Sequence, residues 1–238
     1  MTRTTWKTIR DAIARDIDDG VLRPGAQLPT EPHLAARFAV GRHSIRRAIE
    51  ALARDGKVSV EQGRGTFVEA APRLTYHIGK RTRLRRNLIP QGCTVSGSLL
   101  SADRVPAPPL VSAALHLNPG SLVIESQRIT LADELPVAFG AAYHCAERFP
   151  DFAARRDVLG STTEAYRSYG IADYMRLRTD MHARPATAVE AKTLKQHADV
   201  PVIEVHAVDA TPDGTPLSYS HVIWAAGRVA FTMGSEDG

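Results

Sequence analysis

The stretch VGRHSIRRAIEALARDG, residues 40–56, concentrates positive charge at one end of an expected helix. The basic residues of its first turn and a half are Arg42, His43, Arg46 and Arg47. The apolar residues behind them recur three and four positions apart and form an inward face. A helix that enters the major groove of DNA by its N-terminal end needs this arrangement, because base-reading side chains belong there and core residues belong behind them. Cations that are only solvated are more favourable at the C-terminal end of a helix, because the helix dipole is negative there.

The first turns of this helix supply groups that can read a base edge. Arg42 and Arg46 are four residues apart and share a face, so one guanidinium can bind guanine O6 and N7 while the other holds a phosphate. The helix N-terminus itself favours phosphate. A basic helix end that is only solvated is the alternative interpretation.

Two shorter apolar patterns precede this helix and predict the elements that hold it. The first is a helical stripe made by Trp6, Ile9, Ile13 and Ile17, which Gly20 can end as a left-handed cap. The second follows Thr30, which is placed to cap a short helix. Residues 39–41 then make the turn into the basic helix.

The period of the apolar residues changes to two in KVSVEQGRGTFVE, residues 57–69. We expect two short strands joined by the turn EQGRG, which together form a wing. Arg64 lies between two glycines that let the backbone approach closely, so it can enter a minor groove or bind phosphate. Three helices followed by a wing predict a DNA-binding module.

The run from Leu28 to Val68 resembles the winged helix-turn-helix of the GntR family of bacterial transcription regulators, and the resemblance covers most of residues 6–69. It implies DNA contacts from Arg42, His43, Ser44 and Arg46 of the recognition helix and from Gly63, Arg64, Gly65 and Thr66 of the wing. Thr30 and Arg47 complete the expected DNA-binding set. The implied partner is a double-stranded DNA operator.

The sequence after residue 70 changes in composition and predicts a second domain. Residues 71–100 hold six cationic side chains and no acidic one, whereas the rest of the body is mildly acidic. The runs VIESQRITL with LPVAFGAAYH, and VPVIEVHAVDA with TPLSYSHVIWAA, predict two hairpins, and DYMRLRTDMHAR predicts a strand. A helix capped by Thr187 lies between them. We expect an α+β fold on an antiparallel sheet, with domains at 1–70 and 78–238 and a linker at 71–77.

The segment GSTTEAYRSYG offers hydroxyl groups at the start of an expected helix. Ser161 is placed as its cap, and Thr162 and Thr163 add two hydroxyls beside backbone amides that can bind an anion. Arg128 and Arg176 lie in strand-like runs and would supply the opposite charge. A plain helix cap is the alternative.

This body resembles the UTRA effector domain that follows GntR heads in the HutC subfamily, a domain with a chorismate-lyase-like fold. The motifs that carry the resemblance are TRL from Thr82, R-x-T-L-A-D-E-L-P from Arg128, and the hairpin sequence PLSYSH. Within the subfamily, YHIGKRTRLRRNLIPQG and GIADYMRLRTDMHARPA are most similar to regulators of phosphonate uptake and degradation. The resemblance implies a ligand pocket lined by Thr82, Arg83, Arg128, Thr130, Ser161, Thr162, Thr163, Ser218 and Trp224, with Arg176 or His221 as further cations.

The charge of that implied pocket favours an anionic effector. Other members of the subfamily place glutamates at the positions of Gly140 and Ser218, and neither residue is acidic here. Arginine forks suit phosphate and phosphonate oxygens, so a phosphonate, phosphate or phosphorylated metabolite is the expected ligand. A phosphosugar or an organic acid is the alternative. Each arginine could instead form an ion pair with an aspartate, for which the candidates are Asp133, Asp173 and Asp180.

Several classes of protein are disfavoured by what the sequence lacks. No apolar run of roughly 18 residues exists, so we expect a cytoplasmic protein with no membrane partner. Cys93 and Cys145 show no metal-ligand spacing, and no GxSxG or HExxH motif occurs, so we expect no metal, no cofactor and no catalytic residue. The expected function is a ligand-responsive repressor that binds a palindromic operator as a homodimer. An enzyme of chorismate-lyase-like fold and a DNA-architectural protein are the rival interpretations.

Overall fold

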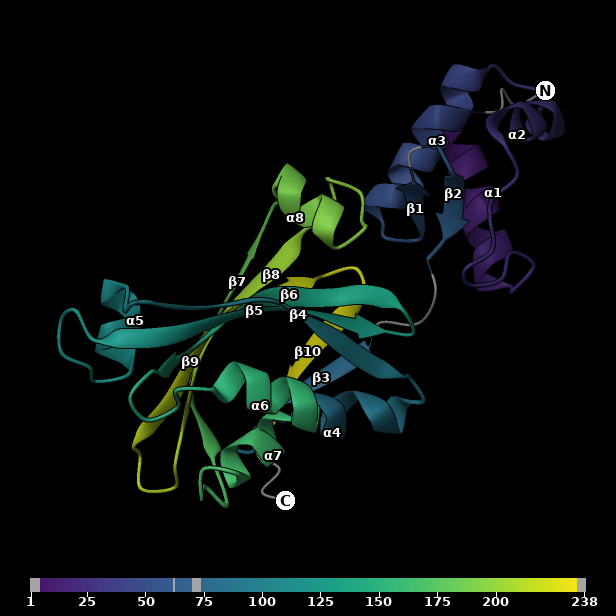
Figure 1. The fold of residues 1–238 in the computed structure, drawn as a ribbon. Coiled ribbons are helices and arrows are strands. Elements are labelled where there is room, and N and C mark those ends of the chain that lie inside the picture. The colour runs from purple at the N-terminus through teal and green to yellow at the C-terminus, as the bar shows by residue number, and fades with distance from the viewer. Residues whose placement is uncertain (1–4, 62, 70–73, 235–238) are drawn as a thin grey trace. The chain divides into compact units, whose positions relative to one another are not determined.

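The computed structural model describes residues 5–61, 63–69 and 74–234 (Figure 1). By its internal contacts the chain divides into two units. The first consists of Met1–Leu74, Pro185–Pro201 and Ala226–Arg228. The second consists of Thr75–Arg184, Val202–Ala225 and Val229–Gly238. The sequence expectation assigned everything after residue 78 to the second domain. The contacts instead assign α8 (Ala188–Thr193) and its flanking residues to the first unit.

Three helices and a hairpin form the N-terminal part of the first unit. They are α1 (Trp6–Asp18), α2 (Glu31–Phe38), α3 (Arg42–Arg54), β1 (Val58–Glu61) and β2 (Gly65–Val68). The predicted apolar faces meet in one core, whose least accessible members are Ile9, Ile13, Leu34, Ile45 and Leu52. The predicted winged helix-turn-helix is confirmed. Gln62, in the expected wing turn, lies outside the described residues.

The turns between these helices follow the expected positions with one difference. Gly20 has a left-handed φ of 73° directly after the last turn of α1, and Ala39 takes φ of 51° between α2 and α3. Thr30 is the N-cap residue of α2, but its hydroxyl lies 2.9 Å from His33 Nδ1 and makes no hydrogen bond to the helix backbone. Thr30 therefore occupies the cap position without capping the helix through its side chain.

A six-stranded antiparallel sheet in the order β4-β5-β6-β9-β8-β7 forms the centre of the second unit. Its strands are β4 (Val95–Pro106), β5 (Leu122–Ala132), β6 (Leu135–Cys145), β7 (Met175–Arg184), β8 (Val202–Ala210) and β9 (Pro216–Ala225). The two predicted hairpins are β5–β6 and β8–β9. The expected α+β fold on an antiparallel sheet is confirmed.

Helices cover the two faces of this sheet differently (Figure 1). The short helices α4 (Leu84–Leu88) and η1 (Ile89–Gln91), with α6 (Phe152–Leu159) and α7 (Thr162–Arg167), lie along one face. Under α6 and α7, Phe149, Phe152 and Tyr166 form an aromatic cluster. On the other face α5 (Pro109–Ala114) packs its Val111 against the sheet. No helix in the described part of the chain is long and apolar enough to cross a membrane.

Part of the segment expected to be a linker, residues 71–77, is a strand. Residues 71–73 lie outside the described residues, and residues 74–77 belong to β3 (Leu74–Ile78), which pairs with β10 (Val229–Met233). The reason is the burial of Tyr76, whose ring lies 4.8 Å from that of Trp224 between centroids. This stacking holds β3 against the sheet.

Candidate nucleic-acid interface and effector site

The recognition helix α3 presents its basic residues away from the core. The exposed residues of its first half are Arg42, His43, Arg46 and Arg47, and the buried ones are Ile45, Ala48 and Ile49. Its N-cap is Gly41, which has no side chain to cover the first backbone amides. Those amides and the positive end of the helix dipole are therefore open to a phosphate.

Two of the four basic residues already have partners inside the unit. Arg46 Nε lies 3.0 Å from Glu31 Oε1 of α2, and 67% of the Arg46 side chain is exposed. The Arg47 guanidinium lies over the Trp6 ring, 4.6 Å from its centroid. Arg42 and His43 make no hydrogen bond or ion pair with any described side chain. Because an exposed ion pair is weak, Arg46 can leave Glu31 and bind a phosphate instead. Arg42 has no such partner to leave.

The wing is supported from beneath by Gln27. Its Nε2 donates to the Arg64 carbonyl oxygen at 2.8 Å, and its backbone forms a β-bridge with Phe67. Gly65 adopts φ of 125°, and a Cβ at this position would collide with the Gln27 side chain. Arg64 forms an ion pair with Glu61, but 72% of its side chain is exposed. The tip therefore offers a cation that a DNA backbone can reach.

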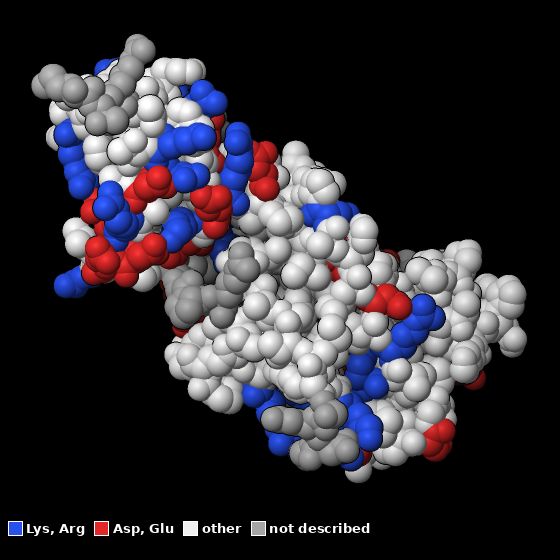
Figure 2. All heavy atoms as spheres, turned by 180° about the vertical axis from the view of Figure 1, so that it is seen from behind, with Lys and Arg blue, Asp and Glu red and all other residues white. Residues whose placement is uncertain are grey.

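Charge on this unit is mixed. On the face shown in Figure 2, basic and acidic side chains lie interspersed over the N-terminal unit. That face is not a basic patch.

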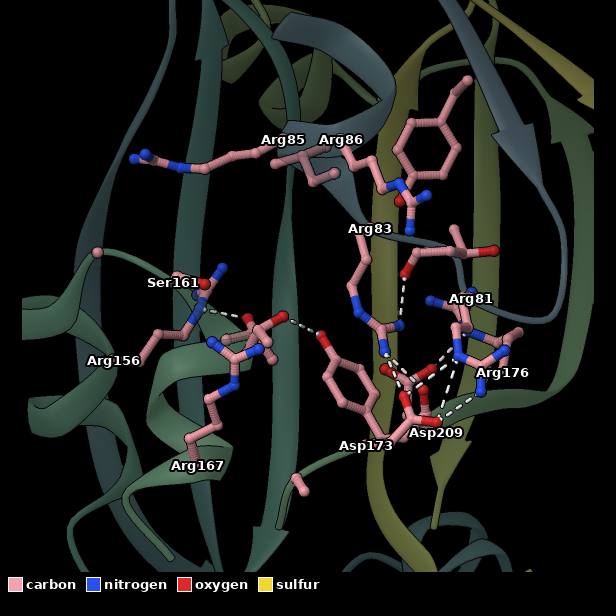
Figure 3. Close-up of a pocket in the computed structure, with 18 residues that line it drawn as sticks. Arg81, Arg83, Arg85, Arg86, Arg156, Ser161, Arg167, Asp173, Arg176 and Asp209 are labelled. Carbon is pink, nitrogen blue, oxygen red and sulfur yellow. Dashed lines mark hydrogen bonds and ion pairs between the residues drawn. The ribbon is translucent and has the colours of Figure 1, made fainter. Parts of the chain in front are cut away.

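A cavity of about 510 Å³ lies in the second unit, between α4, α7 and the sheet (Figure 3). Seven arginines and two aspartates line it. In Figure 3, Arg85 and Arg86 extend from α4, Arg156 and Arg167 lie with Ser161 on one side, and Arg81, Arg83 and Arg176 lie with Asp173 and Asp209 on the other. Such an excess of cations concentrates anions.

Some of these arginines are already committed to protein partners. Arg176 Nε lies 2.6 Å from Asp209 Oδ1, and both side chains are largely buried. Arg83 stacks on the Tyr174 ring at 3.3 Å from its centroid and donates to the Tyr174 carbonyl oxygen at 2.5 Å. The ion-pair alternative thus holds for Arg83, whose Nη2 lies 3.8 Å from Oδ1 of the expected Asp173. It also holds for Arg176, although the partner there is Asp209.

A second, inner cavity of about 170 Å³ shares Arg156, Thr162 and Asp209 with the first. Its other polar lining residues are Ser126, Arg128, Thr130, His144, Ser218 and Ser220. Arg128 Nη2 lies 3.0 Å from Asp157 Oδ1. Arg128 Nη1 is buried and has no hydrogen-bond partner among the described residues. Because a buried, unsatisfied cationic donor is costly, this atom marks where an acceptor would be bound most strongly.

Arg156 of α6 brings a second guanidinium to the inner cavity. Its Nε donates to Thr162 Oγ1 at 2.8 Å. Burial and the neighbouring charge of Arg128 lower the pKa of Arg156 to about 10. Two cations held together away from water destabilise each other, and an anion between them would remove that penalty.

The structure brings most of the expected ligand residues to these two cavities. Thr82, Arg83, Ser161, Thr162, Thr163 and Arg176 line the first, and Arg128, Thr130, Thr162 and Ser218 line the second. The Thr82 hydroxyl is used internally, because it donates to the Gly79 carbonyl oxygen at 2.7 Å.

Trp224 and His221 do not line either cavity. Trp224 packs against Tyr76. Ser220 and Val222 of β9 line the inner cavity, and successive side chains of a strand alternate between faces. His221 therefore lies on the opposite face of the sheet. The expectation that His221 lines the ligand pocket is wrong, because the strand register turns its side chain away from the cavities.

Arg156 and Asp209 line both cavities, and the sequence analysis did not identify them. Arg156 follows the buried Phe152 by four positions, which places it on the inward face of α6. Asp209 stands directly opposite Ser218 in the β8–β9 register. A charged residue at an inward-facing position was the available signal in both cases.

Comparison with known proteins agrees with this division into two functions. The family model described as bacterial regulatory proteins, gntR family, matches residues 5–68, and that described as UTRA domain matches residues 90–230. The protein belongs to the GntR family of bacterial transcription regulators and carries a UTRA domain.

Individual relatives cover nearly the whole chain. The chain is 38% identical over 224 residues to the uncharacterized HTH-type transcriptional regulator RB1450 of Rhizobium meliloti, covering 94% of this chain and 92% of the relative. It is 31% identical over 242 residues to the probable transcriptional regulator PhnF of Escherichia coli, covering 97% and 96%. The crystal structure of PhnF from Mycobacterium smegmatis shares the fold with a TM-score of 0.64 at 24% identity, covering 97% and 100%. RB1450 and PhnF of Escherichia coli are both named as transcriptional regulators.

Proposed function

We propose that this regulator represses genes for the uptake or breakdown of a phosphonate or phosphate compound. It binds a palindromic operator as a homodimer, through the N-terminal end of α3 and the wing, until a small anionic effector releases it. A twofold-symmetric dimer places one recognition helix in each half-site, which is why the operator is palindromic.

The observation that carries the effector class is the unpartnered Nη1 of Arg128 in the inner cavity. The adjacent Arg156 is also poorly compensated, as its lowered pKa indicates. One anion between the two guanidinium groups satisfies the buried donor and offsets the repulsion between the cations.

A phosphonate or phosphate group suits this cavity because it presents three oxygens to several donors at once. Two arginines can take two of them, and the hydroxyls of Thr130, Ser218 and Ser220 line the same space. A ligand with a second acidic group is the other candidate. Arg85 and Arg86 line the outer cavity and pair with no described carboxylate, so they can accept the second charge of a phosphosugar or an organic acid.

Operator release tests both halves of the proposal. DNA from immediately upstream of the protein's own gene is used in gel shifts, with methylphosphonate, inorganic phosphate, glucose 6-phosphate and citrate as probes. We expect methylphosphonate or inorganic phosphate to weaken operator binding at least tenfold, which corresponds to about 1.4 kcal/mol of coupling. Release by glucose 6-phosphate alone or by citrate alone would replace this proposal with the phosphosugar or the organic-acid one.

A matched pair of arginine variants tests the site itself. Arg128→Gln should abolish release while leaving operator binding intact, because it removes the buried guanidinium. The control Arg104→Gln changes an exposed position of β4. The same probes should release this variant from the operator as they release the wild type. Operator binding that no probe affects, or release that survives Arg128→Gln, would contradict the proposed effector site.

A further inference from the structure

Three side chains on the opposite face of the sheet from the effector cavities lie close enough to share one metal ion. Glu204 and His206 are two residues apart on β8, and His221 stands directly opposite His206 on β9. Side chains two apart on a strand, and side chains opposite each other on neighbouring strands, share a face. The ligand atoms of the three residues all lie within 4.8 Å of one another.

We propose that Glu204, His206 and His221 form a binding site for a divalent transition-metal ion, best fitted to Zn²⁺. Two imidazoles and one carboxylate are a common zinc ligand set, and three protein ligands leave the fourth tetrahedral position to water. The site uses none of the residues that line the effector cavities.

The three side chains have to rotate to meet tetrahedral geometry. Ligand atoms bonded to Zn²⁺ at about 2.0–2.1 Å are about 3.3 Å from each other. Glu204 Oε1 lies 3.7 Å from His206 Nε2 and 2.5 Å from His221 Nε2. A bound ion would lengthen the 2.5 Å contact, and rotations of these partly exposed side chains would have to shorten the longer separations, which reach up to 4.8 Å.

Neighbouring groups already orient two of the three ligands. Arg184 Nε lies 2.7 Å from Glu204 Oε2, which leaves Oε1 directed at the histidines. The Tyr219 hydroxyl lies 2.6 Å from His206 Nδ1, so with Nδ1–H donating to that oxygen, Nε2 keeps its lone pair. Metal-binding histidines nearly always donate their other ring N–H in this way.

The exposure of the cluster also suits a metal ion. The His221 side chain is 40% exposed and that of His206 is 32% exposed, so an ion and its water can enter from solvent.

An ion pair between His221 and Glu204 is the simpler explanation for part of this cluster. That ion pair still leaves His206 Nε2 3.7 Å from the same carboxylate oxygen, Glu204 Oε1. The His206 ring stacks on that of His221 with centroids 4.4 Å apart and planes 7° apart. Because the lone pair of an imidazole nitrogen lies in the ring plane, one of the two rings has to turn out of this stack for both to bind one ion.

A Co²⁺ titration of the full-length, tag-free protein, stripped with a chelator that is then removed, tests the site. We expect one equivalent per chain to bind with the strong visible absorption of tetrahedral Co²⁺, and Zn²⁺ to displace it. His206→Gln and His221→Gln should each weaken binding more than tenfold. Tyr219→Phe, which removes only a hydroxyl, should weaken it about 10-fold. The control His116→Asn, at an exposed loop position, should bind like the wild type.

Circular dichroism of each variant separates loss of a ligand from loss of the fold. Absence of saturable Co²⁺ and Zn²⁺ binding in the wild type would overturn the proposal and leave only the ion pair. Equal affinity in the wild type and in a folded His206→Gln, His221→Gln double variant would overturn it as well. Operator release by the anionic probes is expected in both cases, so failure of this site is distinguishable from failure of the proposed effector.

Discussion

Arg128 Nη2 lies 3.0 Å from Asp157 Oδ1, and the two side chains differ in accessibility, with 15% of Arg128 and 51% of Asp157 exposed. The carboxylate reaches solvent while the guanidinium faces the inner cavity. Only one of the two terminal nitrogens of Arg128 is satisfied by this contact. An anionic ligand in the cavity, as proposed, would therefore compete with Asp157 for Arg128.

This relationship predicts that Asp157→Asn tightens anion binding. Removing a half-exposed carboxylate is worth about 1 kcal/mol or less, so affinity should rise about three- to fivefold. The measurement is isothermal titration with methylphosphonate or inorganic phosphate, whichever releases the operator. Asp103→Asn, an exposed aspartate of β4, is the control and should have no effect. Weaker binding by Asp157→Asn would mean that Asp157 orients Arg128 instead of competing for it.

Stability should depend on pH through His144. This residue is buried against Phe152, its ring Nε2 lies 3.1 Å from the Tyr166 hydroxyl, and burial lowers its pKa from 6.5 to about 3. Between these two values the unfolded chain binds a proton that the folded chain does not, so the free energy of unfolding falls as the pH drops below 6.5 and levels off near 3. At pH 5 the loss is at most about 2 kcal/mol.

Urea unfolding at pH 7 and pH 5 measures this contribution as a difference between variants. His144→Gln should lose less stability between the two pH values than the wild type, because glutamine does not titrate. His182→Gln, an exposed histidine of β7, should keep the dependence of the wild type. An unchanged dependence in a folded His144→Gln variant would show that folding does not lower the pKa of His144.

Arg42→Ala should weaken specific operator binding by roughly 1–3 kcal/mol and relax specificity at one base pair. Arg42 is exposed at the start of α3, and no described side chain holds it in another place. Fluorescence anisotropy with operator and with scrambled DNA, at two salt concentrations, separates base reading from phosphate contact. Arg54→Ala, at the far end of the same helix, should change neither. An equal loss on both DNAs would assign Arg42 to the phosphate backbone.

Gly140→Ala should destabilise the second unit by more than about 2 kcal/mol. A Cβ at Gly140 would overlap the His221 carbonyl oxygen and Val222 Cα of β9, which are backbone atoms and cannot rotate away. Thermal unfolding measures the change. Gly41→Ala is the control, since its Cβ would meet nothing within 4 Å, and it should shift the midpoint little. An unchanged unfolding midpoint in Gly140→Ala would show that β6 and β9 can separate locally without loss of stability.

The structure gives Gly140 a packing role that comparison with the subfamily did not indicate. The sequence suggested that a small neutral residue here suits an anionic ligand. The close approach of β9 leaves no space for any side chain on this backbone, so glycine at this position is required for packing as well. The charge argument for the effector therefore depends on Arg128 and Arg156.

Elements with a strong local pattern could be predicted from sequence, and elements without one could not. The apolar spacing of α1 and α3 and the hairpins β5–β6 and β8–β9 are local signals. Strand β4 was not predicted, because it is an edge strand whose sequence VSGSLLSADRVP is mostly exposed and carries little alternation. Strand β3 was taken for linker because the burial of Tyr76 depends on Trp224, which is distant in the chain.

The sequence by itself determined the class of protein, the winged helix-turn-helix with its basic helix end, and the presence of arginines and hydroxyl residues suited to an anion. Only the tertiary structure decided which of these residues meet. Strand register directs Ser218 toward the cavities and His221 toward Glu204. Helix packing places Arg156 close enough to Arg128 for the two charges to interact. The physical reason is that a side chain's type and spacing are local, whereas its partner, its burial and its face are set by segments far apart in the chain.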